Sequence, residues 1–88
     1  LTHNYSNPPR GRVLVEYSVP CGGEVVLEVY DVSGRRVREL VRGEVARGEH
    51  RMEWDGRDSE GRLLSSGVYF LRLEGMGMRA VGKMVLVR

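Results

Sequence analysis

Apolar and polar residues alternate along four stretches of the chain. The odd positions of residues 13–19, 25–29 and 69–73 are apolar or aromatic, and in residues 48–54 the even positions share one face. A period of two is typical of a strand with one buried face. Clusters of Gly, Pro, Asp and Ser separate these stretches at spacings of roughly ten residues. The pattern predicts an all-β sandwich of six or seven mostly antiparallel strands.

Two further segments break strict alternation. In residues 35–42 the apolar positions are Val37, Leu40 and Val41, so we expect a bulge or a short helical turn near Glu39. Residues 62–65 read as a short extended piece that could serve as an edge strand.

Residues 1–12 are polar and contain two prolines and a glycine, which disfavour a helix. We expect them to form an extended N-terminal arm or a linker remnant. Residues 13–88 then make one small domain, and residues 78–87 form its last strand.

Several turns can be placed from the sequence. Asp31 opens a turn that ends at Gly34, and further turn signals end at Gly61 and Gly67. We expect Gly34 and Gly67 to adopt positive φ, because each precedes a strand and follows a serine. Trp54 and Tyr69 are expected in the core, since a small sandwich needs large apolar residues at its centre.

These motifs resemble one family of bacterial immunoglobulin-like (Ig-like) domains. The run Trp-Asp-Gly-Arg-Asp from Trp54, followed by Ser-Gly-Val-Tyr-Phe from Ser66, is similar to the family's signature, and Tyr30 begins a hairpin similar to its "Tyr-Asp-x-x-Gly-Arg-x-Val". That family includes the Ig-like domain of the flagellar hook-capping protein and the C-terminal sorting domains of type IX secretion. The family opening usually reads Asn-Pro-Phe-Asn-Pro, and the chain lacks its Phe at residues 7–11. The motif residues are Tyr30, Asp31, Gly34, Trp54, Asp55, Gly56, Asp58, Gly61, Gly67 and Tyr69.

Charge and composition argue against several classes of function. The formal net charge is +2, thirteen of the 14 basic residues are arginine, and arginines alternate with glutamates without interleaved aromatic residues. That pattern disfavours nucleic acid as a partner. No apolar run reaches the ~18 residues of a transmembrane helix. Cys21 has no second cysteine with which to form an internal disulfide, so it is either free or linked to another chain or group.

The sequence predicts neither an enzyme nor a cofactor-binding protein. Asp55, Asp58 and Glu60 could supply oxygens to calcium, but their spacing is not that of a helix–loop–helix site, so we expect turn-forming carboxylates. His3 and His50 lack ligands at zinc spacing, and no serine has the context of a nucleophile.

The last two strands are apolar on both faces, because Val68, Phe70, Val85 and Val87 oppose an equally apolar inner face. Such an outer face is either an exposed aliphatic surface without a partner or a contact surface for another protein. We expect Val85 and Val87 to make that contact.

The resemblance implies a non-catalytic extracellular or cell-surface module, acting as a C-terminal sorting or attachment domain that contacts secretion or envelope machinery. The alternative is a structural subunit that assembles with copies of itself into a filament or tube through strand edges, with residues 1–12 adding to a neighbour's sheet. A capping role like that of the hook cap is a third hypothesis.

Overall fold

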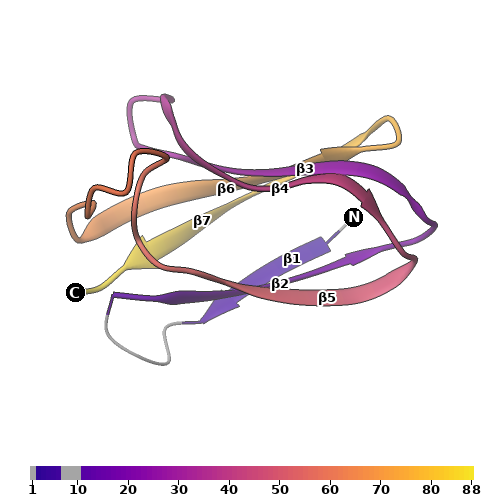
Figure 1. Ribbon diagram of the computed structural model, residues 1–88, viewed down its shortest axis with the longest axis horizontal. Coiled ribbons are helices and arrows are strands. Elements are labelled where there is room, and N and C mark those ends of the chain that lie inside the picture. Colours follow the sequence, from indigo (N-terminus) through magenta and orange to yellow (C-terminus); the bar gives the residue numbers. More distant parts are fainter. Residues whose placement is uncertain (1, 7–10) are drawn as a thin grey trace.

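A computed structural model describes residues 2–6 and 11–88, with side chains from residue 11 onward. In this part of the chain seven strands form two sheets that pack face to face (Figure 1). The strands, in chain order, are β1 (Thr2–Ser6), β2 (Val13–Val19), β3 (Gly23–Tyr30), β4 (Arg36–Val45), β5 (Gly48–Trp54), β6 (Gly67–Gly75) and β7 (Met78–Leu86).

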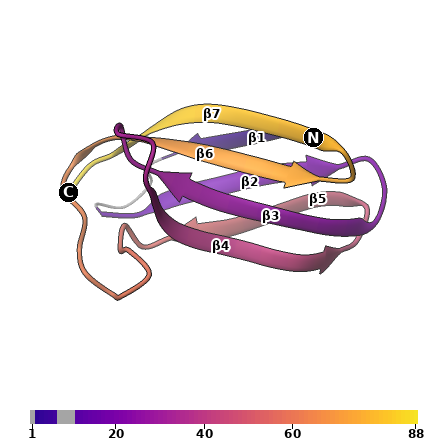
Figure 2. The same cartoon turned by 90° about the horizontal axis from the view of Figure 1, so that it is seen from above.

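One sheet has the order β1-β2-β5 and the other β4-β3-β6-β7, and all of their strand pairs are antiparallel. Seen from above, β4 and β5 lie along one side of the sandwich, and β7 and β1 lie along the other (Figure 2). This architecture confirms the predicted all-β sandwich of six or seven strands.

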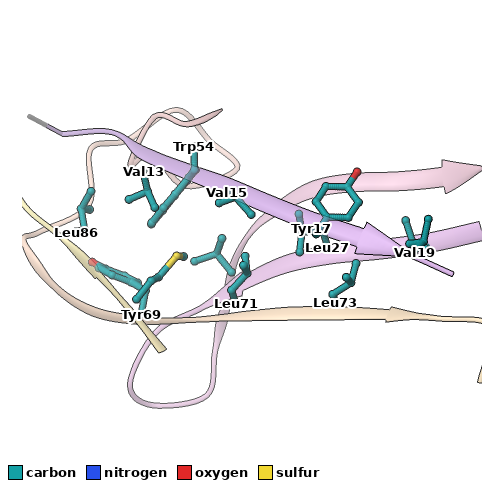
Figure 3. Packing of buried hydrophobic residues seen from close by; sticks show 13 residues of the cluster. Val13, Val15, Tyr17, Val19, Leu27, Trp54, Tyr69, Leu71, Leu73 and Leu86 are labelled. Atoms are coloured by element: carbon teal, nitrogen blue, oxygen red, sulfur yellow. The ribbon is translucent and has the colours of Figure 1, made fainter. Parts of the chain in front are cut away.

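The alternating residues form the core between the sheets, as predicted. Every apolar odd position of β2, β3 and β6 is buried, and so are Met84 and Leu86 of β7 (Figure 3). Trp54 is fully buried at the end of β5, and its ring meets the ring of Tyr69 edge to face, with centroids 5.5 Å apart. This pair joins the two sheets at one end of the sandwich.

Strand β4 contains the predicted irregularity. Leu27 pairs with Val41 and Glu28 with Glu39, so Leu40 is an extra residue on β4. A second register shift occurs two residues further along, between Val29 and Tyr30 of β3. Both are β-bulges, which add twist to this outer strand and let Leu40 pack partly against the core.

The N-terminal segment, expected as an extended arm or a linker remnant, is extended and paired where the structure describes it. Residues 2–6 form β1, which pairs along five residues with β2, while residues 7–10 lie outside the described residues. Backbone pairing needs no apolar side chains, so a polar segment can cover the edge of β2. The prediction of an edge strand at residues 62–65 was wrong. This segment contains only an isolated bridge, which joins Leu63 to Arg57.

Candidate functional site

The turn between β3 and β4 is organised by one carboxylate. Asp31 Oδ1 accepts hydrogen bonds from the Ser33 and Arg35 backbone N–H groups at 2.9 and 3.0 Å and from Ser33 Oγ at 2.6 Å. The N–H of Gly34 donates to the Asp31 carbonyl at 3.0 Å, with Gly34 at the predicted positive φ of 86°. These bonds, led by that of the Ser33 hydroxyl, hold the pKa of Asp31 below its usual value.

The same geometry recurs in the loop after β5. Asp58 Oδ1 accepts hydrogen bonds from the Glu60 and Arg62 backbone N–H groups, both at 2.9 Å, and Gly61 donates to the Asp58 carbonyl at 3.0 Å. The backbone bond from Arg62 is the largest cause that lowers the pKa of Asp58. Both segments read Asp-x-x-Gly-Arg, and we call them the paired turns.

The paired turns lie side by side at one end of the sandwich. The N–H of Ser59 donates to the carbonyl of Val37 at 3.0 Å, which ties the second turn to the strand that leaves the first. A polar hollow of about 200 Å³ lies between them. Sequence reasoning identified each turn, but only the fold brings the two together.

The signature around Trp54 builds a corner at the same end. Trp54 Nε1 donates to the Arg57 carbonyl at 3.0 Å, and Asp55 Oδ1 accepts from the Arg57 N–H at 3.1 Å and from Arg38 at 3.0 Å. A Cβ on Gly56 would lie 3.0 Å from a backbone carbonyl oxygen, so only glycine fits there. The carboxylates of Asp55 and Asp58 therefore serve the turns, and no cluster of three metal-ligating residues occurs in the part of the chain that the structure describes.

The remaining motif residues also serve the fold. The hydroxyl of Tyr69 donates to the Ser65 carbonyl at 2.8 Å, and Gly67 has the predicted positive φ, 153°. Arg88 donates from its guanidinium to the carbonyls of Gly56 and Leu64, which closes this end of the core. The hydrogen bonds of the signature residues thus hold the turns and close this end of the sandwich.

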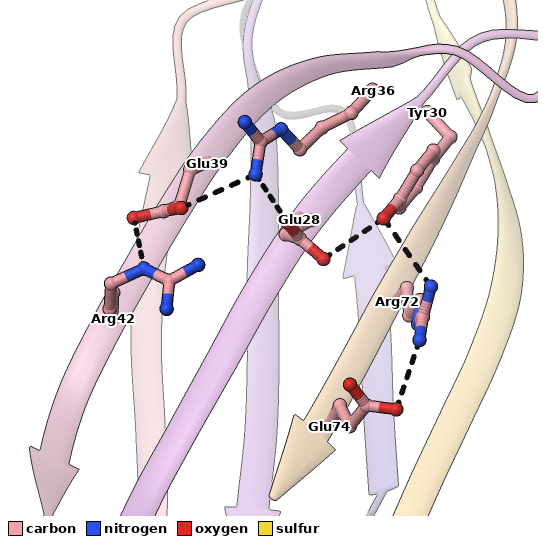
Figure 4. Close-up of polar contacts among 7 residues, drawn as sticks. All are labelled: Glu28, Tyr30, Arg36, Glu39, Arg42, Arg72 and Glu74. Carbon is pink, nitrogen blue, oxygen red and sulfur yellow. Dashed lines mark hydrogen bonds and ion pairs between the residues drawn. The ribbon is translucent and has the colours of Figure 1, made fainter.

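The outer face of the four-stranded sheet carries a network of charges over β4, β3 and β6 (Figure 4). Glu28, buried at its centre, accepts hydrogen bonds from Arg36 at 2.9 Å and from the Tyr30 hydroxyl at 3.0 Å. Arg72 donates to that same hydroxyl at 3.4 Å and to Glu74 at 2.9 Å. On the β4 side, Glu39 bridges Arg36 and Arg42. Opposite charges therefore neutralise one another on this half of the face.

The other half of this face, over β6 and β7, mixes exposed apolar residues with the cations Arg79 and Lys83. Val68 lies opposite Val85, and Phe70 lies opposite Lys83. Val81 is 59% exposed and Val87, just after β7, is 49% exposed, whereas Val85 is half-buried. The predicted pattern of apolar residues on both faces is therefore present, and the predicted contact role of Val85 and Val87 stays a prediction.

A hollow of about 340 Å³ marks the border between the two halves. Its lining comes from the β3–β4 turn and the outer faces of three strands, and includes Tyr30, Val32, Phe70, Arg72, Arg79 and Val81. Sequence reasoning missed this hollow. The signal available was the alternation of Arg79, Val81 and Lys83 along one face of the last strand.

Cys21 is exposed in the turn between β2 and β3, and is a free cysteine in the described part of the chain. Its Sγ lies 3.6 Å from the sulfur of Met76. Within residues 2–6 and 11–88 there is no helix with the length and apolar character that crossing a bilayer requires.

Comparison with known proteins places the chain in a family. No curated protein matches it. The crystal structure of FlgD from P. aeruginosa is similar, with 26% sequence identity and a TM-score of 0.67. The match covers 85% of this chain and 60% of that one, so this chain spans about 60% of the FlgD length.

The sequence model of the FlgD Ig-like domain matches residues 12–77. This family is non-catalytic, and an FlgD-like domain indicates an extracytoplasmic, flagellar type of module. Both findings agree with the resemblance in the turns around Asp31 and Trp54. The chain belongs to the FlgD Ig-like domain family.

Proposed function

We propose that this chain is an attachment module, through which an exported bacterial protein is sorted to the cell envelope or held there. The observation that carries the proposal is the group of exposed apolar side chains on the outer side of β6 and β7, namely Val68, Val81 and Val87. A sheet that faces only water normally carries polar residues on that side. A surface that remains apolar next to a neutralised charge network is suited to contact with another protein.

The structure of the motif residues supports an interaction role by elimination. The carboxylates of Asp31, Asp55 and Asp58 hold turns, and Trp54 and Tyr69 hold the core. The chain then acts through its surfaces. Partners in the secretion or envelope machinery agree with the extracytoplasmic type of the family.

Self-assembly into a filament or tube is the second candidate. The structure adds one condition to it, because residues 2–6 already pair with β2 of their own chain. Addition of this segment to a neighbour would therefore be an exchange of β1 between two copies. The free edges of β4 and β5, on the same side of the sandwich, are the other surfaces available for assembly (Figure 2).

The test replaces Val85 and Val87 together with glutamate in a chain fused to a fluorescent reporter and expressed in a bacterium that retains the parent fusion at its surface. We expect the double variant to fold, because Val85 is only half-buried and Val87 is exposed, but to be released into the medium. The control is Leu63→Glu, which adds a charge at a 59% exposed position outside the apolar face.

Light scattering of the purified parent separates the two candidates. An attachment module is monomeric, whereas a structural subunit forms oligomers that weaken when residues 1–10 are removed. If the parent is monomeric and the double variant is retained as well as the parent, then these exposed apolar residues do not make the contact.

A further inference from the structure

We propose that the 340 Å³ hollow of the outer face binds an apolar side chain of an extended, acidic segment of a partner protein. This inference deepens the proposed function and rests on it, because it states the chemistry of the partner that the attachment module contacts. It also moves the centre of the contact from Val85 and Val87 to Val81.

The hollow has the character of a side-chain pocket. The rings of Tyr30 and Phe70, on neighbouring strands β3 and β6, contribute apolar lining, and Val81 and Val32 add aliphatic groups that are 59% and 73% exposed. Its volume of about 340 Å³ is at the lower end of the range for ligand pockets. That size leaves room for one large aliphatic or aromatic side chain.

The charges around the hollow define the rest of the occupant. Arg79 and Lys83 lie two residues before and after Val81, so all three share the outer face of β7. All twelve acidic residues of the chain are in its described part, and none of them lies within ion-pair distance of Arg79 or Lys83. Glu74 lies opposite Arg79 in register and is hydrogen-bonded to Arg72, which lowers the pKa of Glu74, with a smaller contribution from the charge of Arg79.

These two cations stand out because other cations of the same face, Arg36, Arg42 and Arg72, all have carboxylate partners (Figure 4). Asp31 also lines the hollow and keeps its negative charge, on the side of the β3–β4 turn. The positive part of the rim is therefore its β7 side, where a partner with complementary charge supplies carboxylates.

Spacing favours an extended segment. Residues on one face of a strand repeat at about 6.7 Å, so Arg79, Val81 and Lys83 present a cation, an apolar group and a cation at that interval. An extended chain with the pattern acid-x-apolar-x-acid has the same repeat on one of its faces. It can place two carboxylates on the cations while one apolar side chain enters the hollow.

Binding is measured by fluorescence anisotropy with a labelled synthetic peptide that contains the pattern Glu-Ser-Leu-Ser-Glu, which presents both glutamates and the leucine on one face. We expect Val81→Glu and Arg79→Glu each to weaken binding roughly tenfold or more. The matched controls are Leu63→Glu, at the same 59% exposure as Val81, and Arg47→Glu, another exposed arginine without a carboxylate partner in the described residues. Both controls should bind as the parent does, and added salt should weaken parent binding.

Four results would overturn the inference. They are no peptide binding by the parent, equal losses in variants and controls, binding to phosphatidylglycerol vesicles in place of the peptide, and self-association that Val81→Glu abolishes. Circular dichroism of each variant shows whether it has folded, and Lys83→Glu replaces any variant that has not.

Failure here is distinguishable from failure of the proposed function. If the double variant of Val85 and Val87 is released from the cell surface but the parent binds no acidic peptide, the attachment module stands and only the acidic partner is wrong.

Discussion

Replacing Trp54 with alanine removes the largest side chain of the core. Trp54 is fully buried, and its ring meets Tyr69 edge to face at 5.5 Å. A buried aromatic residue covers ~150–250 Å² of surface, and at ~25 cal/mol per Å² that area corresponds to ~4–6 kcal/mol. The Cβ, which alanine retains, and partial collapse of the site reduce this figure. We therefore expect a loss of ~3–5 kcal/mol in the free energy of unfolding.

The hydrogen bond of the indole adds little to this cost. Trp54 Nε1 donates to the Arg57 carbonyl, but the same oxygen accepts a second hydrogen bond from Arg38 at 3.0 Å. Removing the indole leaves the carbonyl paired, so only the net value of one bond is lost, ~0.5–1.5 kcal/mol. For 88 residues the whole stability is ~4–13 kcal/mol, so the substitution brings the domain close to unfolding.

The assay is equilibrium unfolding in urea, followed by circular dichroism because the variant lacks the chain's single tryptophan. Trp54→Phe is the control, since it keeps an aromatic ring and loses the N–H, and it should cost about half as much as alanine. A loss below ~1 kcal/mol for Trp54→Ala, with an unchanged denaturant slope, would refute the central role of the ring.

Two further predictions concern the turns. Gly34→Val and Gly67→Val should each destabilise the domain in urea unfolding by ~1 kcal/mol or more, because a β-branched residue resists positive φ. No atom lies within 4 Å of a Cβ at either site, so Gly→Ala variants that unfold like the parent would contradict this explanation. Because the folded pKa values of Asp31 and Asp58 are lowered, their stabilisation is complete above about pH 4 and is lost as pH falls further. Asp31→Asn with Asp58→Asn keeps the acceptor oxygens without the titration, so its stability should fall less steeply in acid than that of the parent, and an equal slope would assign the acid sensitivity to other groups.

The core could be predicted from the sequence because one physical rule determines it. Alternation places residues 13, 15, 17 and 19 on one face of a strand, and burial of apolar groups selects that face. The bulge near Glu39 was predictable for the same reason, since three apolar residues could reach the core only if the strand broke its period. The turns at Asp31 and Asp58 were predictable because their hydrogen bonds are local.

Features that depend on pairing between distant strands were not predictable. The pairing of β1 has no apolar pattern, because its bonds are those of the backbone. The contacts of Glu28 with Arg36 and of Tyr30 with Arg72 depend on registers that join three strands. The hollow beside Val81 likewise exists only because β3, β6 and β7 are neighbours in the sheet.

The positions of the ends of β1 and β7 have a mechanical consequence. Thr2 pairs beside Ser18 at one end of the sandwich, and Leu86 lies at the opposite end, where Gly11 donates to the Val87 carbonyl (Figure 1). Tension between these two points runs along β1 and β7. Because the bonds of antiparallel strands are perpendicular to the strands, such tension loads all of the β1–β2 and β6–β7 bonds together, in shear. The sandwich should therefore resist stretching along its long axis far better than peeling of one strand from the side.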